Sequence, residues 1–314
     1  MSWILYTLIY GVLKGARDIV KKESLKISPA VEVLFFYTLF SFILCIPMSQ
    51  GIADIDMKYM PFIVLKSFVI FIAWILSFHA IKNLPISIYG ILDLSRVINA
   101  TLIGFFILHE TITRNQIIGM VLVAAGLLLL KRGKQKENVK VFMVVIALIS
   151  CVLNSVSGFL DKVLTKFVTP SQLQFYYMMY LTLFYLIYFI AAGIIESRKE
   201  RTVAGNAGAD SVDLSHGEGS EVKKAGVLGG SMNIKRAVTN YWIWIIAILF
   251  VIADKSLFIA NANPASKISV MTLIKQAGVI VVILAGKFIY KEKNIGHKFI
   301  CAGIIIAGIV IAVC

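Results

Sequence analysis

Apolar residues in this chain gather in long continuous runs that are separated by polar turns. The runs show no period-two alternation, and a helix needs about 20 apolar residues to cross a bilayer. The pattern therefore predicts an all-α membrane protein with ten transmembrane helices. The predicted spans cover approximately residues 2–20, 30–50, 60–81, 84–107, 114–131, 140–162, 171–194, 240–261, 265–287 and 296–314.

A long polar stretch interrupts this pattern between the seventh and eighth spans. Residues 196–239 are rich in Gly, Ser, Asn and charges of both signs. Such a composition is typical of segments that cannot bury enough apolar surface to fold. We therefore predict a disordered polar loop at 196–239 rather than a further domain.

The two halves of the chain repeat one another. The residues that match include Pro29 with Pro170, Pro85 with Pro264, Ser87 with Ser266, and Arg96 with Lys275. Each half holds five predicted spans, an odd number, so the second half must enter the membrane in the opposite sense. The sequence thus predicts two inverted five-helix repeats, 1–133 and 139–314, a layout found in many secondary transporters. A duplication unrelated to transport is the alternative.

Composition supports a membrane protein and excludes other classes. Of the 314 residues, 59% are hydrophobic and 15% are charged, and the mean hydropathy is +0.86. Soluble domains have about 45–50% apolar and about 25% charged residues. These values exclude an ordinary cytosolic enzyme, a disordered chain and a nucleic-acid binder. The four cysteines lie in apolar runs without a C-x-x-C pair, so neither a metal site nor a disulfide framework is predicted.

Two short stretches carry a family resemblance. Residues 80–87 read AIKNLPIS, residues 108–119 read LHETITRNQIIG, and a weaker copy of the second stretch reads YKEKN at 290–294. This set resembles the repeat signature of the EamA-like drug/metabolite transporter (DMT) superfamily. The resemblance implies two inverted five-helix halves around a central cavity. It also implies substrates such as amino acids, sugars, nucleotide sugars, phosphorylated metabolites or drugs.

Glu110 and Glu292 occupy equivalent positions in the two copies, at helix ends beside basic residues. Their position favours a structural role in capping the next helix. Proton transport is the alternative, because carboxylates within membranes can carry protons.

The basic residues predict the orientation in the membrane. Of 31 Lys and Arg residues, 20 lie in the loops on one side and five on the other. Positive loops stay in the cytoplasm. We therefore predict a multi-pass protein of the cell membrane with the long polar loop in the cytoplasm and both termini outside. Members of the superfamily usually have their termini inside, so the two arguments conflict.

Six basic residues remain within spans, accompanied by three acidic ones: Lys14, Arg17, Lys66, Arg96, Lys255 and Lys275, with Asp18, Asp93 and Asp254. A charge at the centre of a span costs about 2.5–3.5 kcal/mol on insertion scales, so it usually faces a wet cavity or a partner. Lys14 and Asp18 are four residues apart, which predicts mutual neutralisation. Arg17 and Lys66 lie nearer span ends, which favours snorkelling to the interface.

Arg96 and Lys275 are the most informative of these residues because each lies eleven residues after one of the paired prolines. Two cations facing each other across a pseudo-twofold axis would clamp an anion. The resemblance supports this, since phosphate-carrying members use basic residues of the fourth and ninth helices. The alternative is structural, with Arg96 paired to Asp93 and Lys275 to Asp254. The predicted substrate-binding residues are Arg96, Lys275, Lys14, Asp93, Tyr89 and Asp254.

The sequence therefore predicts a secondary transporter, not an enzyme, that moves an anionic or zwitterionic solute by alternating access. No nucleotide-binding motif is present, and no cofactor or metal is expected. The expected partners are a small-molecule substrate and membrane lipid, without nucleic acid, and a homodimer is left open. One alternative is an amino-acid or drug exporter. The other is a membrane-embedded lipid-carrier transferase that uses Asp54 and Asp56 of a D-x-D motif to hold a divalent metal.

Overall fold

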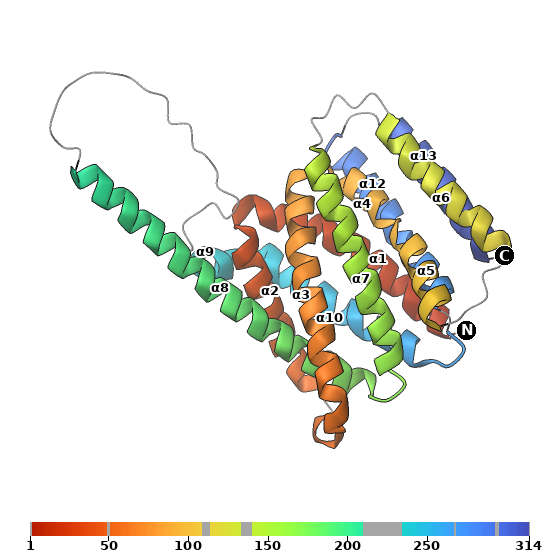
Figure 1. The fold of residues 1–314 in the computed structure, drawn as a ribbon, viewed down its shortest axis with the longest axis horizontal. Helices are drawn as coiled ribbons and strands as arrows, with labels where there is room; N and C mark the ends of the chain where they lie inside the picture. The colour runs from red at the N-terminus through yellow and green to blue at the C-terminus, as the bar shows by residue number, and fades with distance from the viewer. Residues whose placement is uncertain are drawn as a thin grey trace.

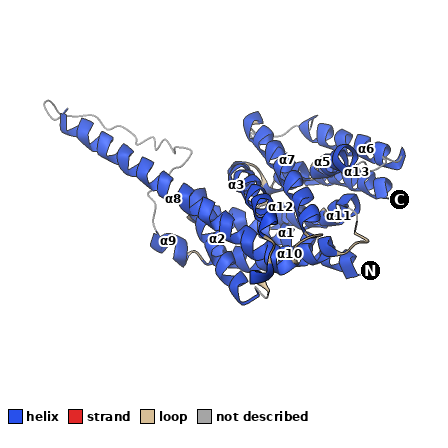
Figure 2. Cartoon of the chain, turned by 60° about the horizontal axis from the view of Figure 1, so that its bottom comes forward, coloured by secondary structure: helices blue, strands red, loops and turns tan. Residues whose placement is uncertain are grey.

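The structure is a computed structural model that describes residues 2–48, 51–108, 114–132, 140–209, 234–266, 268–292 and 295–313. Within these ranges the chain forms helices and no strands (Figures 1 and 2). The all-α prediction is therefore confirmed for the described part of the chain.

The helices follow the predicted apolar runs closely. The first half contains α1 (Ser2–Ile27), α2 (Ala30–Cys45), α3 (Met60–Asn83), α4 (Ile86–Asp93), α5 (Arg96–Leu108) and α6 (Arg114–Arg132), with the short 3₁₀ turns η1 (Ile46–Met48), η2 (Ile52–Asp54) and η3 (Met57–Tyr59) between α2 and α3. The second half contains α7 (Val141–Leu164), α8 (Pro170–Ala209), α9 (Ile234–Thr239), α10 (Tyr241–Ala262), α11 (Ile268–Lys275), α12 (Ala277–Phe288) and α13 (Ile295–Val313).

Several of these helices are suited to crossing a membrane. Five helical segments are long and apolar enough by length and composition: Met57–Asn83, Ile86–Ile107, Val141–Leu164, Pro170–Ile195 and Tyr241–Ala262. Three shorter apolar helices accompany them, at Ala30–Cys45, Gly278–Phe288 and Ile295–Gly308. The chain is therefore a multi-pass membrane protein, while the number of ten spans stays a prediction.

Two predicted spans are not continuous helices. The run predicted at 84–107 divides into α4 and α5, where the amides of Leu94 and Ser95 bond to carbonyls three residues back. The run predicted at 265–287 divides into α11 and α12 at Gln276. Bonds of this kind tighten the helix locally and change its direction, a feature that an apolar pattern does not reveal.

One pair of core helices joins the two halves of the chain. Helices α3 and α7 are antiparallel, since Lys66 contacts Asp161 while Ala73 contacts Ser150. Helix α1 packs against α10, α11 and α12 at the centre of the bundle, and α6 pairs with α13 at one edge (Figure 1).

The polar stretch is partly helical. Helix α8 extends through residue 209, so the predicted disorder is wrong for residues 196–209. Helix α9 is also ordered, because Ala237 is buried and Arg236 binds the buried carboxylate of Glu32 at 2.6 Å. The pairing of Arg236 with a residue 204 positions earlier is not visible in local composition. The remaining predicted loop, residues 210–233, lies outside the described residues.

Candidate functional site

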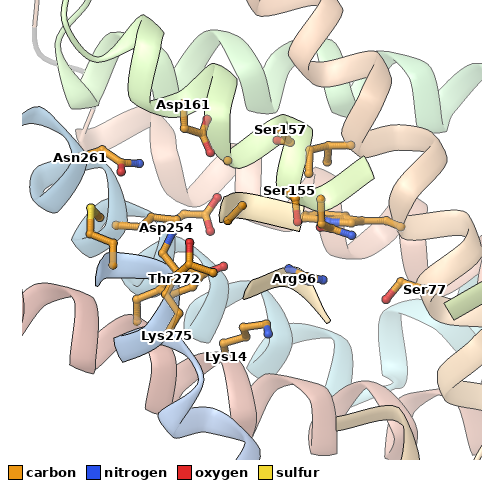
Figure 3. Close-up of a pocket in the computed structure, with 18 of the residues that line it drawn as sticks. Lys14, Ser77, Arg96, Ser155, Ser157, Asp161, Asp254, Asn261, Thr272 and Lys275 are labelled. Atoms are coloured by element: carbon orange, nitrogen blue, oxygen red, sulfur yellow. The ribbon is translucent and has the colours of Figure 1, made fainter. Parts of the chain in front are cut away.

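A polar cavity lies at the centre of the bundle, between α1, α3, α4, α5, α7, α8, α10 and α11 (Figure 3). Its walls carry many charges for a site inside a membrane protein. The basic residues that line it are Lys14, Arg17, Lys21, Lys66, Arg96 and Lys275, and the acidic ones are Asp18, Asp161 and Asp254. The aromatic side chains of Tyr10, Trp74, Tyr89 and Tyr177 complete the wall.

Close backbone contact between α1 and the break of α11 and α12 shapes one wall. A Cβ on Gly15 would collide with the backbone of Gly278, and a Cβ on Gly278 would collide with the carbonyl oxygen of Gly11. A Cβ on Gly11 would lie 2.9 Å from the carbonyl oxygen of Lys275. Glycine is required wherever backbones approach this closely. The G-x-x-x-G pattern thus brings Lys14, between the two glycines of α1, to the same side of the cavity as Lys275 (Figure 3).

Asp93 lies immediately behind this wall, at the end of α4, and is 1% exposed. Its carboxylate contacts the ammonium of Lys14, and its Oδ1 lies 2.6 Å from Nε of Arg96, the first residue of α5. One carboxylate therefore holds two cations across the α4–α5 break. The predicted neutralisation of Lys14 by Asp18 is wrong, because Asp18 pairs instead with Lys21 at 3.1 Å.

Lys275, the last residue of α11, has a different environment. Its ammonium lies 5.6 Å from the ring centroid of Tyr10. In the part of the chain that the structure describes, no carboxylate oxygen lies within 4 Å of it, so the alternative pairing with Asp254 is not formed. Lys275 thus presents a positive charge to the cavity without an anionic partner in the described chain.

Two further ion pairs lie across the cavity. Lys66 is 3.1 Å from Asp161, and its ammonium lies 3.2 Å above the ring of Tyr177. Arg17 is 3.9 Å from Asp254, which accepts a hydrogen bond from Tyr177 at 3.2 Å. Lys66 and Arg17 are 1% and 5% exposed, so the snorkelling interpretation is wrong.

The structure brings together the six residues predicted as a site. Arg96, Lys275, Lys14, Tyr89 and Asp254 line the cavity, and Asp93 supports it from behind. Tyr89 shares a hydrogen bond of 2.6 Å with Ser77. These positions place the residues at one cavity, while their role in binding a substrate stays a prediction.

The site predicted from the sequence does not include five charged residues that line the cavity: Arg17, Asp18, Lys21, Lys66 and Asp161. Arg17 and Lys66 were visible as charges in apolar runs, but their distance from the span centres suggested an interfacial location. Lys21 was assigned to a loop because α1 continues further than the apolar run. Asp161 occupies the end of a predicted span, where a carboxylate is unremarkable.

The cavity carries an excess of positive charge. Six basic side chains face four carboxylates when Asp93 is included. On the uncharged side chains of the wall, two buried polar atoms also have no hydrogen-bond partner within the described residues: Nδ2 of Asn261 and Oε1 of Gln276. Buried polar groups normally find partners. A bound solute with an anionic group, a donor and an acceptor would satisfy this wall.

The described residues contain no cluster of three or more His, Cys, Asp or Glu side chains arranged to hold a metal ion. The D-x-D motif lies in the η2–η3 loop, where Lys58 binds Asp56 at 2.6 Å. This hydrogen bond lowers the pKa of the Asp56 carboxyl. Glu110 lies outside the described residues. Glu292 accepts a hydrogen bond from the amide of Ile86 at 2.7 Å. This contact is with the start of α4 in the first half, whereas the predicted role was to cap the next helix along the chain, α13.

Comparisons with known proteins agree with this architecture. Residues 1–132 match the family model described as the EamA-like transporter family. A solved crystal structure is similar over 100% of this chain and 98% of its own, with a TM-score of 0.65 and 12% sequence identity. At this identity the similarity concerns the fold alone. No curated protein matches the chain.

Proposed function

We propose that the protein is a secondary transporter of the drug/metabolite type, because residues 1–132 match the model of the EamA-like transporter family, within the DMT superfamily. It moves a small organic solute, anionic or zwitterionic, across the cell membrane by alternating access. The cavity between the helices is the binding site.

The proposed architecture has ten spans in two inverted repeats. The broken pair α4–α5 corresponds to the broken pair α11–α12, and the antiparallel arrangement of α3 and α7 agrees with opposite insertion of the halves. Discontinuous helices at equivalent positions of two repeats are a frequent location of transporter binding sites. Arg96 and Lys275 lie at these two breaks.

A single observation carries the proposed substrate class. Lys275 has no carboxylate partner among the described residues. Asp93 contacts both Lys14 and Arg96, so its single negative charge balances only one of these two positive charges. Buried cations are costly unless they are paired. An anionic group of the solute, such as a phosphate or carboxylate, would supply the missing charge.

A zwitterion is the second candidate, favoured by the acidic side of the same cavity. Asp254 and Asp161 line it, and the Arg17–Asp254 distance of 3.9 Å is long for a direct ion pair. An ammonium group of an amino acid would bind there while its carboxylate binds Lys275. The lipid-carrier transferase is less well supported, because Asp56 is exposed and already occupied by Lys58.

Purified protein in liposomes tests the proposal. A thermal-shift screen of phosphorylated, carboxylated and amino-acid metabolites would first identify a stabilising solute, because a ligand stabilises the state that it binds. The expected result is counterflow, in which the labelled solute accumulates inside liposomes that are loaded with the same unlabelled solute. Turnover that depends on a divalent metal, with no counterflow of any stabilising solute, would support the transferase instead.

A further inference from the structure

Two lysines at opposite ends of the cavity bind equivalent backbone carbonyls. The ammonium of Lys22, near the end of α1, donates to the carbonyl oxygen of Leu84, the residue before Pro85. The ammonium of Lys162, near the end of α7, donates to the carbonyl oxygen of Asn263, the residue before Pro264, at 3.2 Å. Each lysine therefore binds the carbonyl that precedes one of the two prolines matched by the repeat.

The repeat matches the two prolines and brings the two lysines to neighbouring, not identical, positions. Aligning Pro29 with Pro170 places Lys162 on Lys21, the neighbour of Lys22. A proline cannot continue the preceding helix, so the carbonyls before it lack the amides that would bind them. Lysine at the end of a neighbouring helix is well suited to bind such carbonyls. The same interaction thus occurs once in each half.

The two interactions lie at opposite ends of the bundle. Helix α3 ends at Asn83, next to Leu84, and helix α10 ends at Ala262, next to Asn263. Helix α10 begins beside the end of α1, since Asn240 donates to the carbonyl of Ser24. Helix α10 therefore ends far from Lys22. We refer to these locations as the Pro85 end and the Pro264 end of the cavity.

The two ends are not closed to the same extent. At the Pro85 end, Glu292 also binds the amide of Ile86 and the hydroxyl of Ser87, which ties the second half of the chain to the start of α4. At the Pro264 end, Lys162 also binds the carbonyl of Asn261 at 2.8 Å. A surface hollow around Lys162 and Pro264 shares Asn261 and Ile268 with the central cavity. The Pro264 end is therefore the end nearer to opening.

We propose that Lys22 and Lys162 are two latches that close the Pro85 end and the Pro264 end of the cavity, and that transport releases them in turn. The inference rests on the proposed transporter function. Each ammonium joins a helix that ends (α3 or α10) to a helix of the same repeat (α1 or α7). Releasing one of them frees the turn before a half-helix, α4 or α11, whose last residue is Asp93 or Lys275.

Cysteine accessibility tests the latches without requiring a substrate. In a chain whose native cysteines are replaced by alanine, Ser155→Cys provides a reporter on the cavity wall (Figure 3). Inside-out and right-side-out membrane vesicles are treated with an impermeant thiol reagent. Lys162→Met is expected to raise labelling from one side and Lys22→Met from the other, each by about tenfold, the equilibrium shift from one charge-assisted hydrogen bond.

Matched controls separate a latch from a general loss of charge. Lys166→Met lies one helical turn beyond Lys162, and Lys82→Met lies at the Pro85 end; both side chains are exposed and should leave labelling unchanged. Lys162→Arg and Lys22→Arg retain a cationic donor and should also resemble the parent. Where a methionine variant fails to fold, the corresponding glutamine variant replaces it with the same expectation.

The outcomes distinguish the latches from transport itself. Unchanged labelling, or a rise from the same side in both variants, would overturn the latches, even if both variants melt at lower temperature as simple helix-capping residues would. Side-specific labelling without counterflow of any solute would support the latches and contradict the proposed function. Counterflow with unchanged labelling would contradict the latches alone.

Discussion

Arg96 and Asp93 face each other across the break between α4 and α5, with Nε of Arg96 2.6 Å from Oδ1 of Asp93. Taken alone, this contact indicates a purely structural ion pair. The same carboxylate, however, also binds the ammonium of Lys14. Asp93 therefore keeps a cationic partner when Arg96 is removed, which separates the structural and substrate-binding interpretations of Arg96.

Arg96→Gln should weaken binding of an anionic solute about ten- to hundredfold, since a charge-assisted hydrogen bond contributes about 1.5–3 kcal/mol. The melting temperature should change little, because Lys14 still neutralises Asp93. Arg96→Lys should be intermediate if the planar guanidinium matters. Calorimetric titration and thermal unfolding of the same samples provide the measurements. Unchanged affinity together with a lower melting temperature that Asp93→Asn restores would establish a structural bridge.

Asp93→Asn should destabilise the protein strongly. It leaves Lys14 and Arg96 without their shared carboxylate, and breaking a buried ion pair costs about 3–5 kcal/mol. Thermal unfolding in detergent should show the loss, and adding Lys14→Met should recover part of it. The matched control is Asp56→Asn, which removes an exposed carboxylate. Equal stability of the two variants would show that the Asp93 cluster contributes nothing.

Lys275→Gln should reduce solute binding without reducing stability, because no carboxylate among the described residues depends on Lys275. The control is Lys255→Gln in α10, whose ammonium donates to Ser171 at 2.6 Å and which does not line the cavity. Solute affinity should fall in the first variant alone. Equal affinity in Lys275→Gln and the parent protein would remove Lys275 from the proposed site.

Gly15→Ala should destabilise the protein and disturb the cavity, because the added Cβ collides with the backbone of Gly278. Overpacking of this kind costs about 1–3 kcal/mol. Gly303→Ala is the matched control, since its Cβ would meet no atom within 4 Å. Thermal unfolding compares the two. Similar melting temperatures would mean that α1 and α12 can separate without cost.

The orientation is testable with a cysteine at Ser215, within the polar stretch. The charge asymmetry predicts that it resists an impermeant thiol reagent in intact cells, because positive loops stay in the cytoplasm. The structure places Lys21 in the cavity and buries Lys298 beside Glu292, so these two of the 20 basic residues are not exposed on the loop side. The asymmetry of the remainder is still large. Ready labelling, with native thiols controlled for, would reverse the orientation.

The sequence by itself determined the helical membrane class and most helix positions. A run of about 20 apolar residues in lipid must satisfy its backbone hydrogen bonds internally. It can do so as a helix or in a closed barrel, and these runs lack the alternation of barrel strands. The charges within those runs also identified the cavity, because an uncompensated charge in a span is retained only where water or a partner faces it. For this reason the sequence alone indicates Arg96, Lys275 and Lys14 as cavity residues.

Only the tertiary structure decided which charges meet. Lys14 appeared to belong with Asp18 on its own helix, yet its partner is Asp93, 79 residues away. Lys66 appeared to reach the interface, yet it is buried between Asp161 and Tyr177. The breaks that place Arg96 and Lys275 at the wall also depend on packing between helices distant in sequence. Hydropathy describes how costly it is to move each residue out of water. Ion-pair partners depend instead on the distances between side chains of different helices, and hydropathy carries no information about those distances.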